Sequence, residues 1–78
     1  MQPEELKSLL ESALPGARAD VASPDNVHFQ ARVVADVFAG QSTLARHRMV
    51  YAALGERMGG EVHALSLRTL TPDEANQA

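Results

Sequence analysis

Three histidines, His28, His47 and His63, are the side chains of this sequence best suited to chemistry. A neutral imidazole binds iron or zinc, and it is the commonest metal ligand in proteins. The sequence contains no cysteine, so a disulfide and a thiolate ligand are both excluded. A metal site must therefore use histidine, aspartate or glutamate, or take ligands from a partner.

His63 is the strongest candidate ligand. It begins a predicted strand beside Gly59 and Gly60, so we expect its ring to reach the surface. The alternative is a partly buried structural histidine. His63 has the same parity as Leu65 and Leu67, which form the apolar face of that strand.

His28 lies on the polar side of another predicted strand, together with Gln30 and Arg32. It is either a ligand or an exposed strand histidine. In the simplest strand register, the rings of His28 and His63 point to opposite sides of the sheet. We expect them to converge only if one of them precedes its regular strand.

The longest predicted helix carries His47 between Leu44 and Tyr51 on an apolar stripe, so packing in the core is its expected role. The stripe also contains Leu54 and Met58 and is widened by Val50. Arg46 and Arg48 flank His47 and must point elsewhere on the helix. Their guanidinium groups are suited to phosphate or to an acidic partner surface. The alternative is a solvated helix face.

The hydrophobic periodicity predicts an α+β domain. The first two strands form an antiparallel hairpin, and a right-handed crossover makes the third strand parallel to the second. We therefore expect a small mixed three-stranded sheet with helices packed on one face. Ser42 or Thr43 is suited to cap the long helix, and Gly59–Gly60 to end it. The predicted elements are a helix over residues 3–14, strands over 17–22 and 27–35, a helix over 43–58, a strand over 62–70 and a short helix that begins after Thr71.

The composition is that of one acidic domain covering residues 1–78. The net charge is −3, from seven Lys and Arg against ten Asp and Glu, which argues against nonspecific nucleic-acid binding as the main role. No apolar run approaches the ~20 residues that span a bilayer, and the N-terminus lacks the pattern of a secretory signal, so we expect a cytoplasmic protein. No serine has a positioned base and no glycine-rich phosphate loop occurs, so we expect no enzyme activity.

Five short sequence words occur in order along the chain: Val27–Phe29, Val37–Gly40, Ala45–Tyr51, Gly60–Leu65 and Thr69–Pro72. Together they resemble the BolA family over nearly all of the chain from Val27 onward. The resemblance implies a fold similar to the type II KH domain, which agrees with the predicted order of elements. The Gly-x-x-Gly word with which KH domains clamp nucleic acid is absent from the sequence.

BolA-like proteins are partners of monothiol glutaredoxins. The resemblance implies that this chain shares a bridging 2Fe–2S cluster, for iron–sulfur cluster transfer or iron sensing. One iron is then held by the glutaredoxin cysteine and glutathione, and the other by BolA-type residues. The isolated chain is expected to carry no cluster and to be a monomer or a weak homodimer.

His63 matches the invariant histidine of the family's Val-His-Ala-Leu word. In the family, the second ligand is a His or Cys in the loop between the first two strands. Here residues 23–26 of that loop are Ser-Pro-Asp-Asn, and His28 is the nearest histidine. Asp25 or a water is the alternative second ligand.

The resemblance also implies a second function, that of a DNA-binding transcriptional regulator of stress or morphology genes. Arg46, Arg48 and Arg32 would then contact phosphates, and the binding would weaken steeply with salt. The acidic total charge and the missing Gly-x-x-Gly word make this the alternative. A third interpretation is a structural adaptor without a metal, whose partner binding does not depend on His63.

Overall fold

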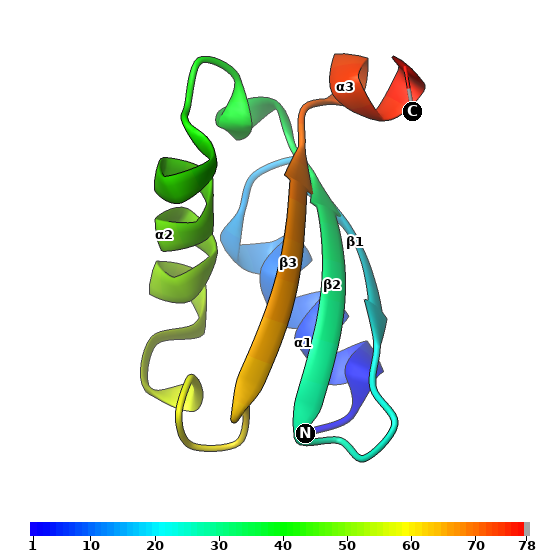
Figure 1. Cartoon of the computed structure of the whole chain (residues 1–78), viewed down its shortest axis with the longest axis vertical. Helices are drawn as coiled ribbons and strands as arrows, with labels where there is room; N and C mark the ends of the chain where they lie inside the picture. The colour runs from blue at the N-terminus through cyan, green and yellow to red at the C-terminus, as the bar shows by residue number, and fades with distance from the viewer. Residues whose placement is uncertain (78) are drawn as a thin grey trace.

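The computed structural model describes residues 1–77 and contains the predicted elements in the predicted order (Figure 1). The helices are α1 (Pro3–Ala13), α2 (Thr43–Leu54) and α3 (Pro72–Gln77), and the strands are β1 (Arg18–Ala22), β2 (His28–Val34) and β3 (Ala64–Leu70). Two 3₁₀ turns, Asp36–Phe38 and Gly55–Arg57, precede and follow α2. Within the described residues, no helix combines the length and apolar character needed to cross a membrane.

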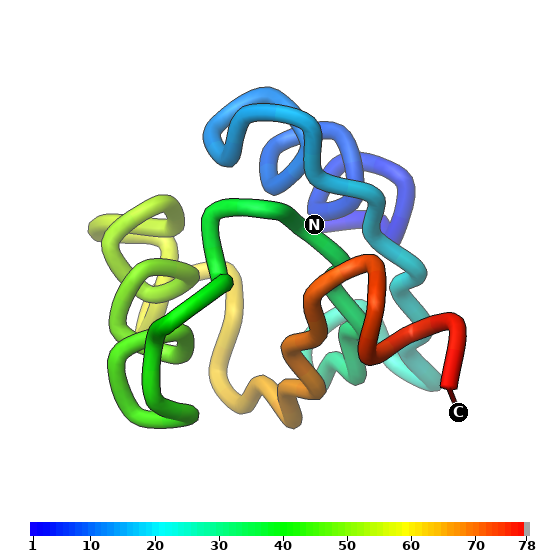
Figure 2. The backbone as a smooth tube through the Cα atoms, turned by 90° about the horizontal axis from the view of Figure 1, so that it is seen from above, coloured from blue at the N-terminus to red at the C-terminus, as the bar shows by residue number. Residues whose placement is uncertain are grey.

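The strands form one mixed sheet in the order β1-β2-β3. β1 and β2 are antiparallel, with Arg18 opposite Val34, and β2 and β3 are parallel, with His28 opposite Ala64. α1 and α2 lie on the same side of the sheet, and most of the other face is left open (Figure 2). The predicted α+β architecture is therefore confirmed.

Alternation along the strands sends one set of side chains under the helices. Phe29, Ala31 and Val33 of β2 are buried, whereas His28 and Gln30 on the other face are exposed. Full burial of a large apolar side chain contributes about 1.5–3 kcal/mol, so this cluster is the main source of stability in so small a domain. Helices and connections add Leu6, Leu10, Leu14, Phe38, Val50, Leu54 and Val62 to the core.

The buried face of α2 agrees with only part of the predicted stripe. Leu44 and Tyr51 are 59% and 39% exposed, whereas Val50 and Leu54 are fully buried. His47, which was expected to pack in the core between Leu44 and Tyr51, is only half-buried. The stripe prediction was right for Val50 and Leu54 and wrong for Leu44 and Tyr51, because it followed side-chain hydrophobicity alone.

Arg46 explains the difference. It occupies the core-facing position one turn before Val50, and its guanidinium carbon lies 5.9 Å from the centre of the Phe38 ring. An arginine can bury its aliphatic stem and place its guanidinium over an aromatic ring. It can therefore occupy a position on the buried side of a helix, although its hydropathy predicts a surface position.

α2 begins as predicted and ends early. The hydroxyl of Ser42 accepts a hydrogen bond from the N–H of Ala45 at 3.1 Å and caps the helix. The last residue of the helix is Leu54, because the next residue, Gly55, adopts a φ of +56° that ends the helical backbone. Gly59, predicted as the left-handed cap, has a φ of +91° but lies in the following turn.

Charged side chains cover part of both sheet edges. On the β1 edge, Lys7 Nζ donates to the carbonyl of Ala19 at 2.6 Å, and Glu11 accepts from the N–H of Ala19 at 3.0 Å. On the β3 edge, Arg46 donates to the carbonyl of Thr69 at 3.2 Å. Each contact satisfies a main-chain group that an edge strand leaves unpaired.

Candidate functional site

The two candidate ligands lie side by side at one end of the sheet, where β2 and β3 begin (Figure 1). His28 is opposite Ala64 in the parallel register, and the N–H of His63 donates to the carbonyl of Val27 at 3.1 Å. Adjacent strands lie about 4.8 Å apart, so the backbones of the two histidines are close neighbours. Both side chains are exposed.

His63 precedes the regular strand. Val62 is fully buried, His63 and Ala64 are both exposed, and Leu65 is half-buried, so strict alternation fails at His63. His63 is exposed, as expected for a ring that reaches the surface, and the alternative of a partly buried histidine on the face of Leu65 does not agree with the structure. The condition set for the two histidines to converge, that one of them precedes its strand, is met.

The turn before β3 is the physical cause of this change. The N–H of Val62 donates to the carbonyl of Arg57 at 2.9 Å, and the carbonyl of Val62 accepts from the N–H of Gly59 at 2.7 Å. These bonds fix Val62 with its side chain in the core. The chain bends at His63, and the ladder with β2 becomes regular only from Ala64.

His28 is held by Asp25 of the loop between β1 and β2. The Nδ1 atom of His28 lies 2.7 Å from Oδ2 of Asp25. The other oxygen, Oδ1, accepts the backbone N–H groups of His28 and Val27 at 2.8 and 3.0 Å. The loop itself is fixed by the hydroxyl of Ser23, which accepts the N–H of Asn26 at 2.9 Å, and by a φ of +62° at Asn26.

These hydrogen bonds stabilise the ionised form of Asp25 and orient the ring of His28. The pKa of Asp25 is lowered well below its usual range, first by the backbone N–H of His28, then by the His28 ring and the N–H of Val27. A carboxylate only accepts hydrogen bonds, so Nδ1 of His28 is the donor. In the neutral ring, Nε2 then carries the lone pair and points away from Asp25, as in metal sites where a carboxylate orients a ligating histidine.

Asp25 was considered as a direct ligand, and its geometry favours a different role. Both of its oxygens are engaged with Val27 and His28, so it acts on the site through the ring of His28. The signal in the sequence was an aspartate three residues before a histidine, within a turn.

The donors that this end of the sheet offers are the two imidazoles. Within residues 1–77, no group of three or more His, Cys, Asp or Glu side chains is arranged to hold a metal ion. His28 and His63 offer two exposed imidazoles at one end of the sheet. A tetrahedral iron coordinated by two imidazoles needs its remaining ligands from elsewhere.

Arg46, predicted as part of a partner or nucleic-acid surface, is engaged inside the protein. Its side chain is only 12% exposed, and its guanidinium lies 2.6 Å from the carboxylate of Glu74. It also donates to the carbonyls of Gln41 and Thr69 at 3.0 and 3.2 Å. The assignment of Arg46 to a binding surface is therefore corrected.

The other two arginines do not form one surface. Arg48 is exposed on α2, whereas Arg32 lies on the open face of the sheet, opposite the face that α2 covers. Arg32 lies 4.0 Å from the carboxylate of Asp20. The three arginines that were predicted as one set therefore have three different environments.

The chain was compared with known protein families and proteins. A family model described as BolA-like protein matches residues 1–74. The chain is 44% identical over 72 residues to BolA-like protein 1 of Homo sapiens, which is 92% of this chain and 50% of that protein. It is 42% identical over 57 residues to the DNA-binding transcriptional regulator BolA of Escherichia coli strain K12, which is 73% of this chain and 54% of that protein. The chain thus spans about half the length of these curated relatives.

A solved structure gives the same result for the fold. The structure of a bolA protein homologue from Coxiella burnetii matches with a TM-score of 0.88 and 43% sequence identity, and the match covers 97% of both chains.

Proposed function

The chain belongs to the BolA family, and from this we propose that it is a partner of a monothiol glutaredoxin with which it shares a bridging 2Fe–2S cluster. The glutaredoxin cysteine and glutathione hold one iron in this proposal, and His63 and His28 hold the other. When bound, the cluster supplies iron and sulfide for transfer to an acceptor, or a signal of iron supply. The cytoplasmic location stays a prediction.

One observation carries the proposal: two exposed histidines lie at the adjoining starts of two parallel strands. His63 stands outside the regular strand, so strand parity does not force its ring under the helices. His28 is oriented by Asp25, which leaves Nε2 as its coordinating atom.

Residues of the chain would prepare the site in three ways. The buried side chain of Val62 anchors the turn that presents His63. Asp25 keeps Nδ1 of His28 protonated and so fixes which ring nitrogen is free to bind. Ala64, opposite His28, is small and leaves space beside the ring.

The test is to mix the purified chain with a monothiol glutaredoxin that holds its cluster and to record visible absorption and circular dichroism. We expect the wild type to change the cluster spectrum, because imidazole replaces sulfur or oxygen ligands on one iron. His63→Ala and His28→Ala should each lose this change. His47→Ala is the matched control, since His47 lies on α2 and should leave the spectrum as in the wild type. A His63→Ala variant with the wild-type mixed spectrum would remove the ligand assignment.

The second candidate function is DNA binding, which is favoured by the name of the Escherichia coli relative, a DNA-binding transcriptional regulator. Arg48 and Arg32 are the predicted phosphate contacts that are not enclosed in an internal network. The measurement is the affinity for a DNA duplex as a function of salt, which falls with a slope set by the number of phosphate contacts. Absence of binding at low salt would exclude this function.

A further inference from the structure

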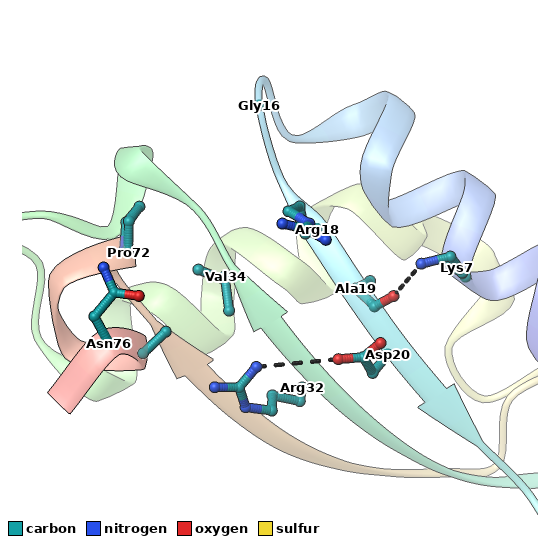
Figure 3. A pocket seen from close by; sticks show the side chains of 10 residues that line it. Lys7, Gly16, Arg18, Ala19, Asp20, Arg32, Val34, Pro72 and Asn76 are labelled. Atoms are coloured by element: carbon teal, nitrogen blue, oxygen red, sulfur yellow. Dashed lines mark hydrogen bonds and ion pairs between the residues drawn. The ribbon is translucent and has the colours of Figure 1, made fainter. Parts of the chain in front are cut away.

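A hollow of about 350 Å³ lies on the open face of the sheet, between β1, the last half of β2 and α3 (Figure 3). It is lined by Arg18 and Asp20 of β1, Arg32 and Val34 of β2, and Asn76 of α3. We call it the arginine hollow. Its volume is in the range of pockets that hold small ligands. It adjoins the end of β2, whereas the histidine site adjoins the start of β2.

Strand register brings two arginines together in the arginine hollow. Arg18 is opposite Val34 and Asp20 is opposite Arg32, so Arg18 and Arg32 are diagonal neighbours on the same face. Diagonal neighbours of an antiparallel pair lie about 7–8 Å apart, within reach of long side chains. One anion of the size of phosphate can therefore contact both guanidinium groups.

The positive charge of these arginines is poorly neutralised within the chain. Arg18 is exposed and forms no ion pair with any residue of 1–77. Arg32 is 4.0 Å from the carboxylate of Asp20, whose side chain is 82% exposed. Arg68 lies directly opposite Arg32 in the parallel register and adds a third guanidinium to this face. A local positive surface thus exists on a chain of net charge −3.

Besides the arginines, the hollow is lined by a side-chain amide, that of Asn76, and by an apolar side chain, that of Val34. Asn76 lines the hollow from the α3 side, where its carboxamide lies beside Pro72 (Figure 3). Val34 forms part of the floor. Lys7 stands at the rim, but its ammonium is already held by Glu11 and by a backbone carbonyl, so it contributes charge at a distance.

We propose that the arginine hollow binds a phosphate group through the guanidinium groups of Arg18 and Arg32, with the amide of Asn76 as a further donor. Guanidinium presents paired N–H donors that match phosphate oxygens. The carboxylate of Asp20, 4.0 Å from the guanidinium of Arg32, is the negative charge with which the phosphate competes. The phosphate belongs either to a small free compound or to a DNA backbone, and the site chemistry is the same for both.

The test is a nitrogen-15 NMR titration of the whole chain with pyrophosphate, compared with sodium chloride at equal ionic strength. We expect saturable shifts at the Nε–H groups of Arg18 and Arg32 and at the side-chain amide of Asn76. Arg18→Gln and Arg32→Gln should each weaken binding by roughly tenfold or more, because each removes a charged hydrogen bond. Arg57→Gln is the matched control, since Arg57 is an exposed arginine of the 3₁₀ turn after α2 and does not line the arginine hollow, and it should bind as the wild type does.

Asp20→Asn should change the affinity for pyrophosphate in the opposite direction to the arginine substitutions. It removes the competing carboxylate, so the affinity for pyrophosphate should rise severalfold. A short DNA duplex at the same phosphate concentration separates the two sources: saturation by pyrophosphate supports a free compound, and saturation by the duplex alone supports a DNA backbone. Shifts that remain proportional to the concentration of both probes, or an Arg18→Gln variant that binds as tightly as the Arg57→Gln control, overturn the proposal.

Discussion

Arg46 and Glu74 join the start of α2 to α3 across 28 residues of chain. The guanidinium of Arg46 donates to both oxygens of the Glu74 carboxylate, at 2.6 and 3.4 Å. Glu74 in turn accepts the N–H of Thr71 at 2.8 Å, and the hydroxyl of Thr71 accepts the N–H of Glu74 at 3.2 Å. This reciprocal cap starts α3, so the ion pair fixes the short helix as well as the end of β3.

Arg46→Met should destabilise the domain by about 2 kcal/mol in urea unfolding. Methionine keeps most of the apolar stem that packs by Phe38, but it removes the donors to the carbonyls of Gln41 and Thr69. The control is Arg48→Met, which replaces an exposed arginine of the same helix and should change the free energy of unfolding by less than about 0.5 kcal/mol. Equal effects of the two substitutions would contradict the internal role of Arg46.

The pair with Arg46 also predicts a dependence of stability on pH. The hydrogen bond from Arg46, with that from the N–H of Thr71, lowers the pKa of Glu74 from 4.5 to about 2. Because the folded-state pKa is the lower one, the stabilisation is present above pH 4.5 and is lost as the pH falls toward 2. The unfolding free energies of wild type and Glu74→Gln should therefore converge over this interval. A difference that stays constant with pH would contradict the assignment.

Asp25→Asn should change the tautomer of His28. In the wild type, the carboxylate of Asp25 holds the proton on Nδ1, and the amide of asparagine no longer imposes this choice. Nitrogen-15 shifts of the imidazole rings, measured where the rings are neutral, should show the Nδ1–H form of His28 in the wild type and a mixture in the variant. The rings of His47 and His63 serve as internal controls and should keep their shifts.

The same variant separates two roles of Asp25. If Asp25 only shapes the loop, Asp25→Asn should shift the backbone signals of residues 23–28 and leave the signals of the His28 ring unchanged. If Asp25 orients His28 as a ligand, Asp25→Asn should also slow or weaken the change in the cluster spectrum on mixing with glutaredoxin. Ser23→Ala, which loosens the loop without touching the ring of His28, is the comparison for the first role.

Glu11→Ala should expose one amide of β1 to solvent. The carboxylate of Glu11 accepts the N–H of Ala19 at 3.0 Å, and this bond is the largest cause of the lowered pKa of Glu11. Hydrogen exchange of the Ala19 amide should become faster in the variant, while that of Val33 on the central strand should keep its protection. Unchanged exchange at Ala19 would mean that the bond does not persist in solution.

Much of the fold was predictable because its signals are local. The alternation of apolar and polar residues in β2 predicted its buried residues, Phe29, Ala31 and Val33. The capping residue Ser42 predicted where α2 begins. The parallel pairing of β2 and β3 followed from the helix between them. None of these inferences needs a contact between distant side chains.

The wrong and missed predictions have a different origin. Each concerns a residue whose position depends on a tertiary contact, and hydrophobic periodicity does not predict such contacts. Arg46 occupies a core-facing position because it contacts Phe38 and Glu74, so Leu44 and Tyr51 were wrongly assigned to the buried face of α2. Likewise, His63 is exposed because backbone hydrogen bonds of Val62 fix the turn before β3. The orientation of His28 by Asp25 was also missed, since a short-range turn pattern does not reveal which side chain the aspartate accepts from.

The charged contacts at the two sheet edges limit how another protein can dock. A partner that extends the sheet by adding a strand must bond to the free backbone groups of an edge. Lys7 and Glu11 already occupy the groups of Ala19 in the middle of β1, and Arg46 occupies the carbonyl of Thr69 near the end of β3. An added strand would have to displace these side chains, so the two edges favour recognition through side chains at the strand ends or on the open face.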